Sequence, residues 1–285
     1  MLSLRHTKWL VVTLIVSIVL VLGLGAAPPD AGPPDAGPLP PGLAVKVFVH
    51  HPRGHDTGVT AASICADPSP SGCADFAIAT TSGGLPIRWQ DPTGGGAGIP
   101  YYVQLNYSAK TSPALTKSAA LAAIDASFAT WETASDAGLN YTNKGTLSRA
   151  TLPRLDGKNV VGWKAVRSNA IAVTYVWYYT STGYIAETDM VFNNNYRWAY
   201  TPPVCDADGN DACDPATYED PTNSGVAKAM DVRNIGTHEA GHTLMLLDMY
   251  DASHANLTMY GYGDYAEMRK DTLAKGDDLG VKAIY

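Results

Sequence analysis

Residues 238–242, His-Glu-Ala-Gly-His, place two imidazoles four positions apart with a carboxylate between them. On an α-helix, side chains four positions apart lie one above the other, so both rings can bind one cation. Glu239 is turned by about 100° from His238, which suits proton transfer at a metal-bound water better than metal ligation. The pattern predicts a hydrolytic zinc site with His238 and His242 as ligands and Glu239 as general base.

A catalytic zinc ion needs a third protein ligand and keeps one position open. We predict Asp248 as this ligand, although on an unbroken helix it would lie about 120° round from His242. The helix therefore has to end near residues 245–246. A carboxylate at a helix C-terminus is disfavoured by the helix dipole unless a cation compensates it, as zinc would. The alternative third ligand is His254, followed by Asp251 and Glu267.

The flanking residues predict the helix that carries this site. Asp231 is placed to cap its N-terminus. A second set of side chains lies roughly opposite the two histidines: Val232, Ala240, Thr243 and Leu247. One side of the helix should therefore face a core and the other a cleft.

Hydrophobic periodicity predicts the remaining elements. A helix capped by Thr116 should run to about residue 134, with an apolar stripe formed by Leu121, Ile124, Phe128 and Trp131. A short helix should follow at 277–284, and strands are predicted at 43–50, 99–107, 171–179 and 184–194. This mixture favours one α/β (α+β) domain built on a mixed sheet.

Together these segments resemble the metzincin zinc peptidases. Residues 238–248, HEAGHTLMLLD, are similar to the motif H-E-x-x-H-x-x-G-x-x-H/D, in which snapalysin-type enzymes have Asp at the third-ligand position, here Asp248. Residues 257–263, LTMYGYG, resemble the Met-turn, with Met259 as the methionine that forms an apolar floor. The segments most similar to the matrixins are IPYYVQLNY, LAAIDASFATWE, IAETDMVFN and LAKGDDLGVKAIY.

The resemblance implies a fold and an activity for residues 76–285. It implies a metzincin-like, matrixin-like catalytic domain with a twisted mixed sheet, a long helix in its N-terminal half and an active-site helix. The implied activity is that of a zinc endopeptidase, whose polypeptide substrate would pair with an edge strand expected at 185–192. Residues 42–75 are not covered by the resemblance and form an N-terminal extension of unclear role.

Two positions depart from the metzincin pattern. The family's glycine is Met245 here, and a residue with a Cβ takes the left-handed conformation at a cost of about 1 kcal/mol. Where some members bring a tyrosine to the metal, this chain has Gly261, and we expect the flanking Tyr260 and Tyr262 to pack in an aromatic turn.

Two other functions stay open. One is a non-catalytic extracellular binding module whose zinc is structural or lost, although such a site has no use for the unligated carboxylate of Glu239. The other is a gluzincin-like peptidase with Glu267 as the third ligand. The formal net charge of −7 argues against nucleic-acid binding, because phosphate neutralisation needs an excess of Lys and Arg.

The N-terminal sequence predicts export. Arg5 and Lys8 precede an apolar run at about 9–25, so residues 1–27 are either a signal peptide or an uncleaved N-terminal anchor. Residues 28–41, with PPDAG twice, predict a Pro-rich linker. We therefore expect a secreted or surface-anchored protein, monomeric, with membrane contact only through residues 9–25 if they are retained.

Other clusters suggest loops that stabilise the exported chain. We predict local disulfides, one joining Cys65 to Cys73 and the other Cys205 to Cys213. The second loop is a candidate calcium site or a solvated turn, and its oxygen-bearing side chains are Asp206, Asp208, Asn210, Asp211 and Asp214. The segment HHPRGHD at 50–56 is predicted to be a solvated turn, with a second metal site as the alternative.

Overall fold

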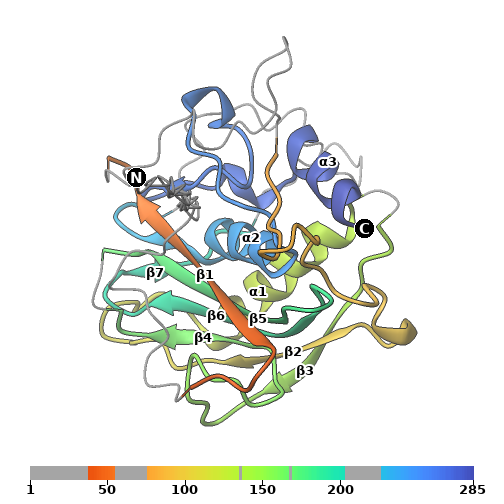
Figure 1. Cartoon of the computed structure of the whole chain (residues 1–285). Coiled ribbons are helices and arrows are strands. Elements are labelled where there is room, and N and C mark those ends of the chain that lie inside the picture. Colours follow the sequence, from red (N-terminus) through yellow and green to blue (C-terminus); the bar gives the residue numbers. More distant parts are fainter. Residues whose placement is uncertain (1–37, 55–75, 135–136, 167–168, 203–225) are drawn as a thin grey trace, which may run out of the picture.

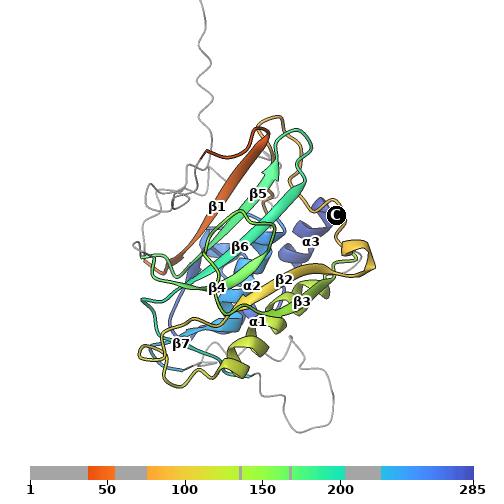
Figure 2. The ribbon, with the colours of Figure 1, turned by 90° about the horizontal axis from the view of Figure 1, so that it is seen from below.

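The fold is known from a computed structural model, which describes residues 38–54, 76–134, 137–166, 169–202 and 226–285. Its centre is a seven-stranded mixed sheet in the order β3-β2-β4-β6-β5-β1-β9. Helices α1 and α2 lie side by side on one face of this sheet (Figures 1 and 2). The expected mixed α/β fold is confirmed.

The strands of the large sheet are β1 (Leu43–Pro52), β2 (Ile99–Gln104), β3 (Tyr141–Thr146), β4 (Val160–Lys164), β5 (Ala172–Tyr179), β6 (Ile185–Asn193) and β9 (Tyr262–Gly263). A small pair consists of β7 (Trp198–Ala199) and β8 (Met230–Asp231). The helices are α1 (Lys117–Glu132), α2 (Val232–Thr243) and α3 (Lys275–Ile284). The four strands and two helices predicted from periodicity, and the helix predicted around the two histidines, are all present, with ends shifted by a few residues.

The strand 185–192, expected at the sheet edge, lies inside the sheet, so that prediction is wrong. As β6 it pairs parallel with β4 on one side and antiparallel with β5 on the other. The turn after β5 reverses the chain, so β5 and β6 pair antiparallel and β5 lies between β6 and β1. Both strands are buried along almost their whole length, so their hydropathy does not indicate which one is closer to the edge.

The outer side of β5 is covered by β1. The two strands pair antiparallel over eight positions, from Leu43 opposite Tyr179 to His50 opposite Ala172. The end of β1 also pairs parallel with β9. Residues 43–52 of the expected N-terminal extension are therefore part of the central sheet.

Helix α1 packs against α2 through the predicted apolar stripe. Thr116 caps α1 by accepting a hydrogen bond from the backbone N–H of Ala119 at 3.1 Å. Phe128 and Trp131 are buried, and the Trp131 indole donates to the Thr237 carbonyl of α2 at 2.7 Å. This hydrogen bond between the helices fixes how α2 is positioned along the sheet.

Within the described residues, no helix has both the length and the apolar character needed to cross a membrane. The predicted signal or anchor segment 1–27 and most of the linker 28–41 lie outside the described residues. Both predicted disulfides and the calcium candidates Asp206, Asp208, Asn210, Asp211 and Asp214 lie outside them as well.

Candidate metal centre

Three side chains converge beside the C-terminal half of α2. Asp248 Oδ1 lies 3.1 Å from His238 Nε2 and 3.5 Å from His242 Nε2. The ligand atoms of these three residues all lie within 4.8 Å of one another. Zinc–nitrogen bonds of about 2.0–2.1 Å in a tetrahedron separate neighbouring donor atoms by about 3.3–3.4 Å. The spacing therefore fits one zinc ion held by three ligands.

The outer nitrogens of both histidines fix the orientation of their rings. His238 Nδ1 lies 2.7 Å from the Thr258 carbonyl, and His242 Nδ1 lies 2.7 Å from the Leu246 carbonyl. A carbonyl oxygen only accepts, so each Nδ1 must carry the proton. Nε2 of each ring then faces Asp248 Oδ1, and in the neutral ring its lone pair would be available to a metal ion. Metal-binding histidines are oriented in this way by their second nitrogen.

The three inward-facing atoms are buried and have no hydrogen-bond partner. Burial lowers the pKa of His238 to about 4, so this ring is neutral near pH 7. The pKa of Asp248 lies below its usual range: burial opposes ionisation, but the charge of His242, whose own pKa is raised by Asp248, outweighs it. The site thus places an ionised carboxylate beside two imidazole nitrogens, a set of donor atoms that suits a cation.

The end of α2 brings Asp248 back to the histidines. The helix stops at Thr243, and Met245 takes the left-handed conformation with φ 71°. The predicted break near 245–246 is therefore confirmed, without a glycine. The Met245 side chain is fully buried in a cluster with Phe48 and Ile87, which offsets the backbone strain.

Replacing Met245 with Gly should destabilise the protein, because packing outweighs strain at this position. Removing the buried side chain costs more than the left-handed backbone does, leaving a net loss of about 1–3 kcal/mol in the free energy of unfolding. Urea unfolding of the metal-free protein measures it. The control is Lys228→Gly, since Lys228 has φ 58° but an exposed side chain and should be nearly neutral. A Met245→Gly variant as stable as wild type would contradict the argument.

Glu239 lies next to the three converging residues but points to a different set of partners. Thr174 Oγ1 on β5 donates to Glu239 Oε2 at 2.5 Å. Glu239 Oε1 faces His50 Nδ1 on β1 at 3.4 Å. Burial raises the pKa of Glu239 to about 7, against the lowering effects of the His242 charge and the Thr174 hydrogen bond. A carboxylate with this pKa can both take and give a proton near neutral pH.

The raised pKa of Glu239 should be visible in the stability of the metal-free protein. At pH values between the ordinary pKa of 4.5 and the folded-state pKa of about 7, Glu239 is ionised in the unfolded state but protonated in the folded state. The free energy of unfolding should therefore fall as the pH rises through this window. Glu239→Gln removes this titrating group. As the pH rises from about 4.5 to about 7, the free energy of unfolding of wild type should therefore fall relative to that of the variant. Urea unfolding with a chelator tests it, and parallel pH profiles of the two proteins would contradict it.

The floor of the centre is formed by Met259. It is buried, and a Cβ added to Gly241 would collide with its sulfur and with Trp131. Gly241, inside the motif, therefore has to be small for α2 to lie on Met259. Asp277 at the start of α3 accepts hydrogen bonds from the backbone N–H groups of Thr258 and Met259 and holds this turn.

The tyrosines after the Met-turn pack against one another, as expected. The Tyr260 and Tyr262 ring centroids lie 5.6 Å apart in an edge-on arrangement, and Tyr250 packs on Tyr262 at 5.1 Å. A Cβ on Gly261 would collide with the Tyr250 ring. Burial, then the charge of Asp248, raises the pKa of Tyr250. Tyr250 therefore borders the centre at a position that we did not predict.

The other predicted ligands lie apart from this cluster. His254 ends a short 3-10 helix, and Asp251 caps that helix by accepting from Ser253. Glu267 accepts a hydrogen bond from Arg269 Nε at 2.6 Å. Among the described residues, the groups that could hold a metal contain none of these three. Of the four candidates for the third ligand, Asp248 is therefore the one that lies with His238 and His242.

His50 and His51 are buried in β1, so the predicted solvated turn is wrong at these two positions. His50 belongs to a second group of clustered side chains with His238 and Glu239. The alternation of 43–50 could have signalled this, because it places Phe48 and His50 on one face of the strand. No comparable pattern indicates the burial of Lys270, which lies in a charged stretch of the chain but is fully buried.

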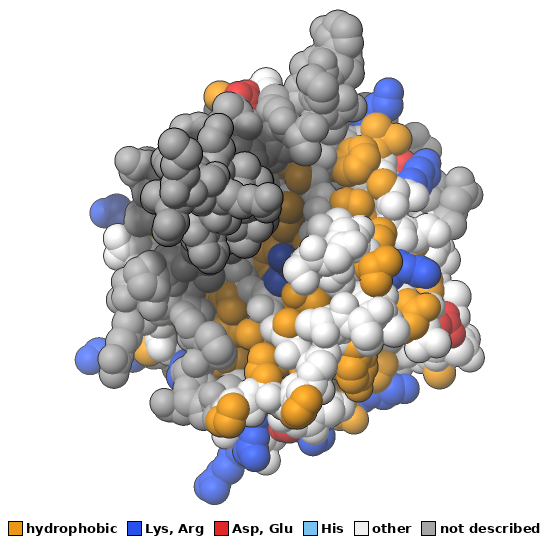
Figure 3. Space-filling model, viewed as in Figure 1, with side chains coloured by type: hydrophobic (Ala, Val, Ile, Leu, Met, Phe, Trp, Pro, Cys, Tyr) orange, Lys and Arg blue, Asp and Glu red, His pale blue; other side chains and the backbone are white. Residues whose placement is uncertain are grey.

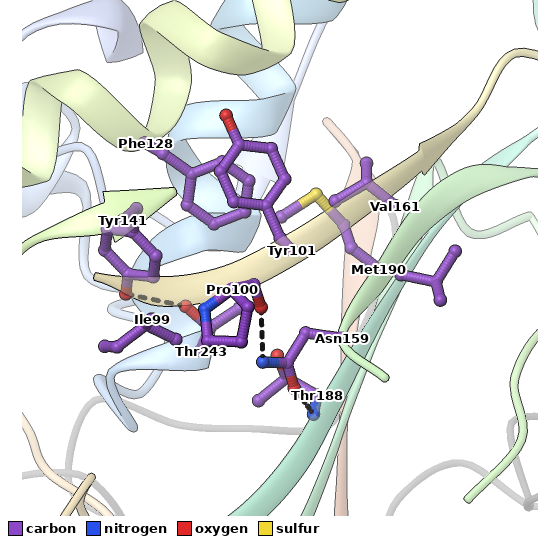
Figure 4. A pocket seen from close by; sticks show the side chains of 11 residues that line it. Ile99, Pro100, Tyr101, Phe128, Tyr141, Asn159, Val161, Thr188, Met190 and Thr243 are labelled. Atoms are coloured by element: carbon purple, nitrogen blue, oxygen red, sulfur yellow. Dashed lines mark hydrogen bonds between the residues drawn. The ribbon is translucent and has the colours of Figure 1, made fainter. Parts of the chain in front are cut away.

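A separate pocket lies beyond the C-terminal end of α2 (Figure 4). Its side chains come from β2, α1, β3, β4 and β6, and it includes Thr243, whose hydroxyl lies 3.2 Å from that of Tyr141. The Asn159 amide bridges two strands there by donating to the Pro100 carbonyl at 2.8 Å. None of the three converging side chains lines this pocket.

The space-filling view shows the face on which β1 lies (Figure 3). In the described part of this face, hydrophobic and uncharged side chains predominate in the middle, and no His side chain is visible. This agrees with the burial of His50, His238 and His242.

No protein-family model matches the chain, and no curated protein matches its sequence.

Proposed function

We propose that the protein is a zinc-dependent endopeptidase with His238, His242 and Asp248 as metal ligands and Glu239 as the proton carrier. The observation that carries the proposal is the direction of the two imidazoles. Both point Nε2 at the same carboxylate oxygen, at 3.1 and 3.5 Å, in a buried place where these three atoms have no hydrogen-bond partner and one cation could be held by all of them. Two histidines with one carboxylate is a ligand set typical of zinc hydrolases.

A bound zinc ion would activate water and polarise the carbonyl of the bond to be cut. Glu239 takes the proton that the attacking water gives up, as the new carbon–oxygen bond forms. It then gives this proton to the leaving nitrogen, as the carbon–nitrogen bond breaks. Thr174 holds Oε2, so Oε1 is the oxygen that handles the proton. Met259 supports α2 from below and keeps both histidine rings in place.

The class of substrate and the location follow from the metzincin resemblance. We propose polypeptide substrates, with zinc as the resident metal and a secreted or surface-anchored location. The acidic chain gives no reason to expect a nucleic-acid partner. The buried state of the centre also favours a second candidate, a non-catalytic module with structural zinc, since structural sites are closed to water.

Metal analysis combined with a cleavage assay separates the two candidates. Protein purified without added chelator should contain one zinc ion per chain and cleave casein. A chelator should abolish cleavage, and zinc should restore it. Protein that binds zinc but does not cleave casein would support the structural candidate, and protein that binds no transition metal would refute both.

A further inference from the structure

Strand β1 passes the part of β5 that contacts Glu239, the proposed proton carrier. In the register of β1 and β5, Phe48 is the partner of Thr174, whose hydroxyl binds Glu239. The pairing of β1 uses the outer edge of β5 over eight positions. Figure 1 shows β1 crossing beside α2. An extended segment of the chain therefore fills the space next to the centre.

Alternate residues of β1 point into the centre. The Phe48 ring stacks on the His242 ring, with centroids 4.3 Å apart and an angle of 9° between the planes. The His50 ring lies 3.9 Å from that of His238. Val49, between them, belongs to a hydrophobic cluster on the other face of the sheet. The side chains of a bound extended peptide alternate in the same way: every second one enters the binding site, and the others point away from it.

A buried lysine holds the histidine of β1 in place. Lys270 Nζ donates to the carbonyls of Tyr260 and Tyr262 at 2.7 and 2.6 Å, and it lies 3.1 Å from His50 Nε2. The ammonium group only donates, so Nε2 accepts and the proton of His50 sits on Nδ1. This proton faces Glu239 Oε1 at 3.4 Å. The oxygen that should handle the proton of water is therefore contacted by β1.

We propose that β1 occupies the centre as an extended peptide ligand of the same chain, so that this structure is the closed form of the enzyme. Release of β1 opens a groove along β5 that binds extended peptides with an aromatic residue and a histidine two positions apart. The inference rests on the proposed peptidase function. It is supported by the buried, unpartnered metal-facing atoms, which no peptide bond can reach while Phe48 and His50 cover them.

The first test compares how β1 and the rest of the sheet open. The double variant Phe48→Ala/His50→Ala is made in the full chain, and amide hydrogen exchange is followed in the zinc-loaded protein. Amides of β1 should exchange about tenfold faster or more than in wild type, while those of β4 stay unchanged. Dipicolinic acid should also remove zinc from the double variant about tenfold faster than from wild type.

Ile124→Ala is the matched control, because it weakens a core cluster that contains no residue of β1. It should speed exchange in all strands together. If the double variant behaves like this control, or changes nothing, β1 is an integral strand and the inference fails. Wild type gives the same test without any substitution. The free energy of opening measured by exchange should depend less on denaturant for the β1 amides than for the β4 amides.

A peptide with the sequence of residues 43–52 tests what the opened groove binds. Added to the double variant, it should slow zinc removal about tenfold, whereas the same peptide with Ala at both key positions should have little effect. Equal effects of the two peptides would overturn the proposed pattern.

Casein cleavage distinguishes the failure of this inference from that of the proposed function. If the double variant cleaves several-fold faster than wild type, both stand. Independent opening of β1 without any cleavage refutes the peptidase and leaves β1 as a ligand of the metal centre. Full cleavage by wild type while β1 amides stay protected refutes the closed form and leaves the peptidase.

Discussion

Replacing Glu239 with Gln should reduce kcat/KM for peptide cleavage by about 10²–10⁴-fold while the zinc content stays at the wild-type level. The amide has the shape of the carboxylate and can still accept the hydrogen bond from Thr174 Oγ1. It cannot take a proton from water. The loss should therefore appear in kcat, with metal binding and folding unchanged.

The measurement is made in the Phe48→Ala/His50→Ala background as well as in the otherwise unchanged chain, because the proposed closed form would limit the rate with either residue at position 239. Glu187→Gln is the matched control, because Glu187 is also a buried glutamate but lies on β6 and accepts hydrogen bonds from the backbone N–H groups of Asp156 and Gly157. It should retain activity. Cleavage by Glu239→Gln above a few per cent of the wild-type rate would remove Glu239 from the proposed role.

The sequence was informative wherever chemistry depends on local spacing. The four-residue separation of His238 and His242 places them together on any helix. The cap at Asp231, which accepts from the N–H groups of Arg233 and Asn234, starts that helix at the predicted residue. The need to bring Asp248 back to the rings required a break, and the structure has one at Met245.

Long-range pairing was not accessible in this way. Residues 43–52 lie about 120 positions before β5, and nothing in their alternation specifies a partner. The segment AVTYVWYY of β5 is apolar on both faces, so its pattern cannot distinguish an edge strand from an inner one. The sequence therefore pointed to the three side chains that converge and to a strand at 43–50, but not to the pairing that brings this strand to them.

The buried charge of Lys270 illustrates a second limit. In sequence, Arg269-Lys270-Asp271 is typical of an exposed charged turn, and burial of a lysine is rare unless it is fully hydrogen-bonded. Two backbone carbonyls and His50 satisfy it here. Burial lowers the pKa of Lys270 to about 8, so it remains mostly charged near neutral pH. Only the three-dimensional arrangement brings these acceptors together.

Replacing Asp248 with Ala should lower the affinity for zinc by more than about 100-fold, a larger effect than the loss of a supporting residue outside the ligand set produces. The carboxylate supplies a donor atom and the negative charge that offsets the cation. It also stabilises protonated His242, whose pKa lies above its ordinary value because Asp248 outweighs the lowering effect of burial. Competition with a chromophoric chelator measures the affinity.

Two further variants test whether Asp248→Ala lowers the zinc affinity because a metal ligand is lost. Asp248→His exchanges one zinc ligand for another and should keep most of the affinity, since imidazole and carboxylate both bind zinc at about 2.0–2.2 Å. His254→Ala should leave zinc binding unchanged, because His254 lies outside the group of converging ligands. If His254→Ala loses zinc while Asp248→Ala retains it, the left-handed turn at Met245 serves packing and not the metal. The third ligand would then come from the 3-10 turn that follows the helix, and the tetrahedral arrangement inferred from the 3.1 and 3.5 Å distances would be wrong.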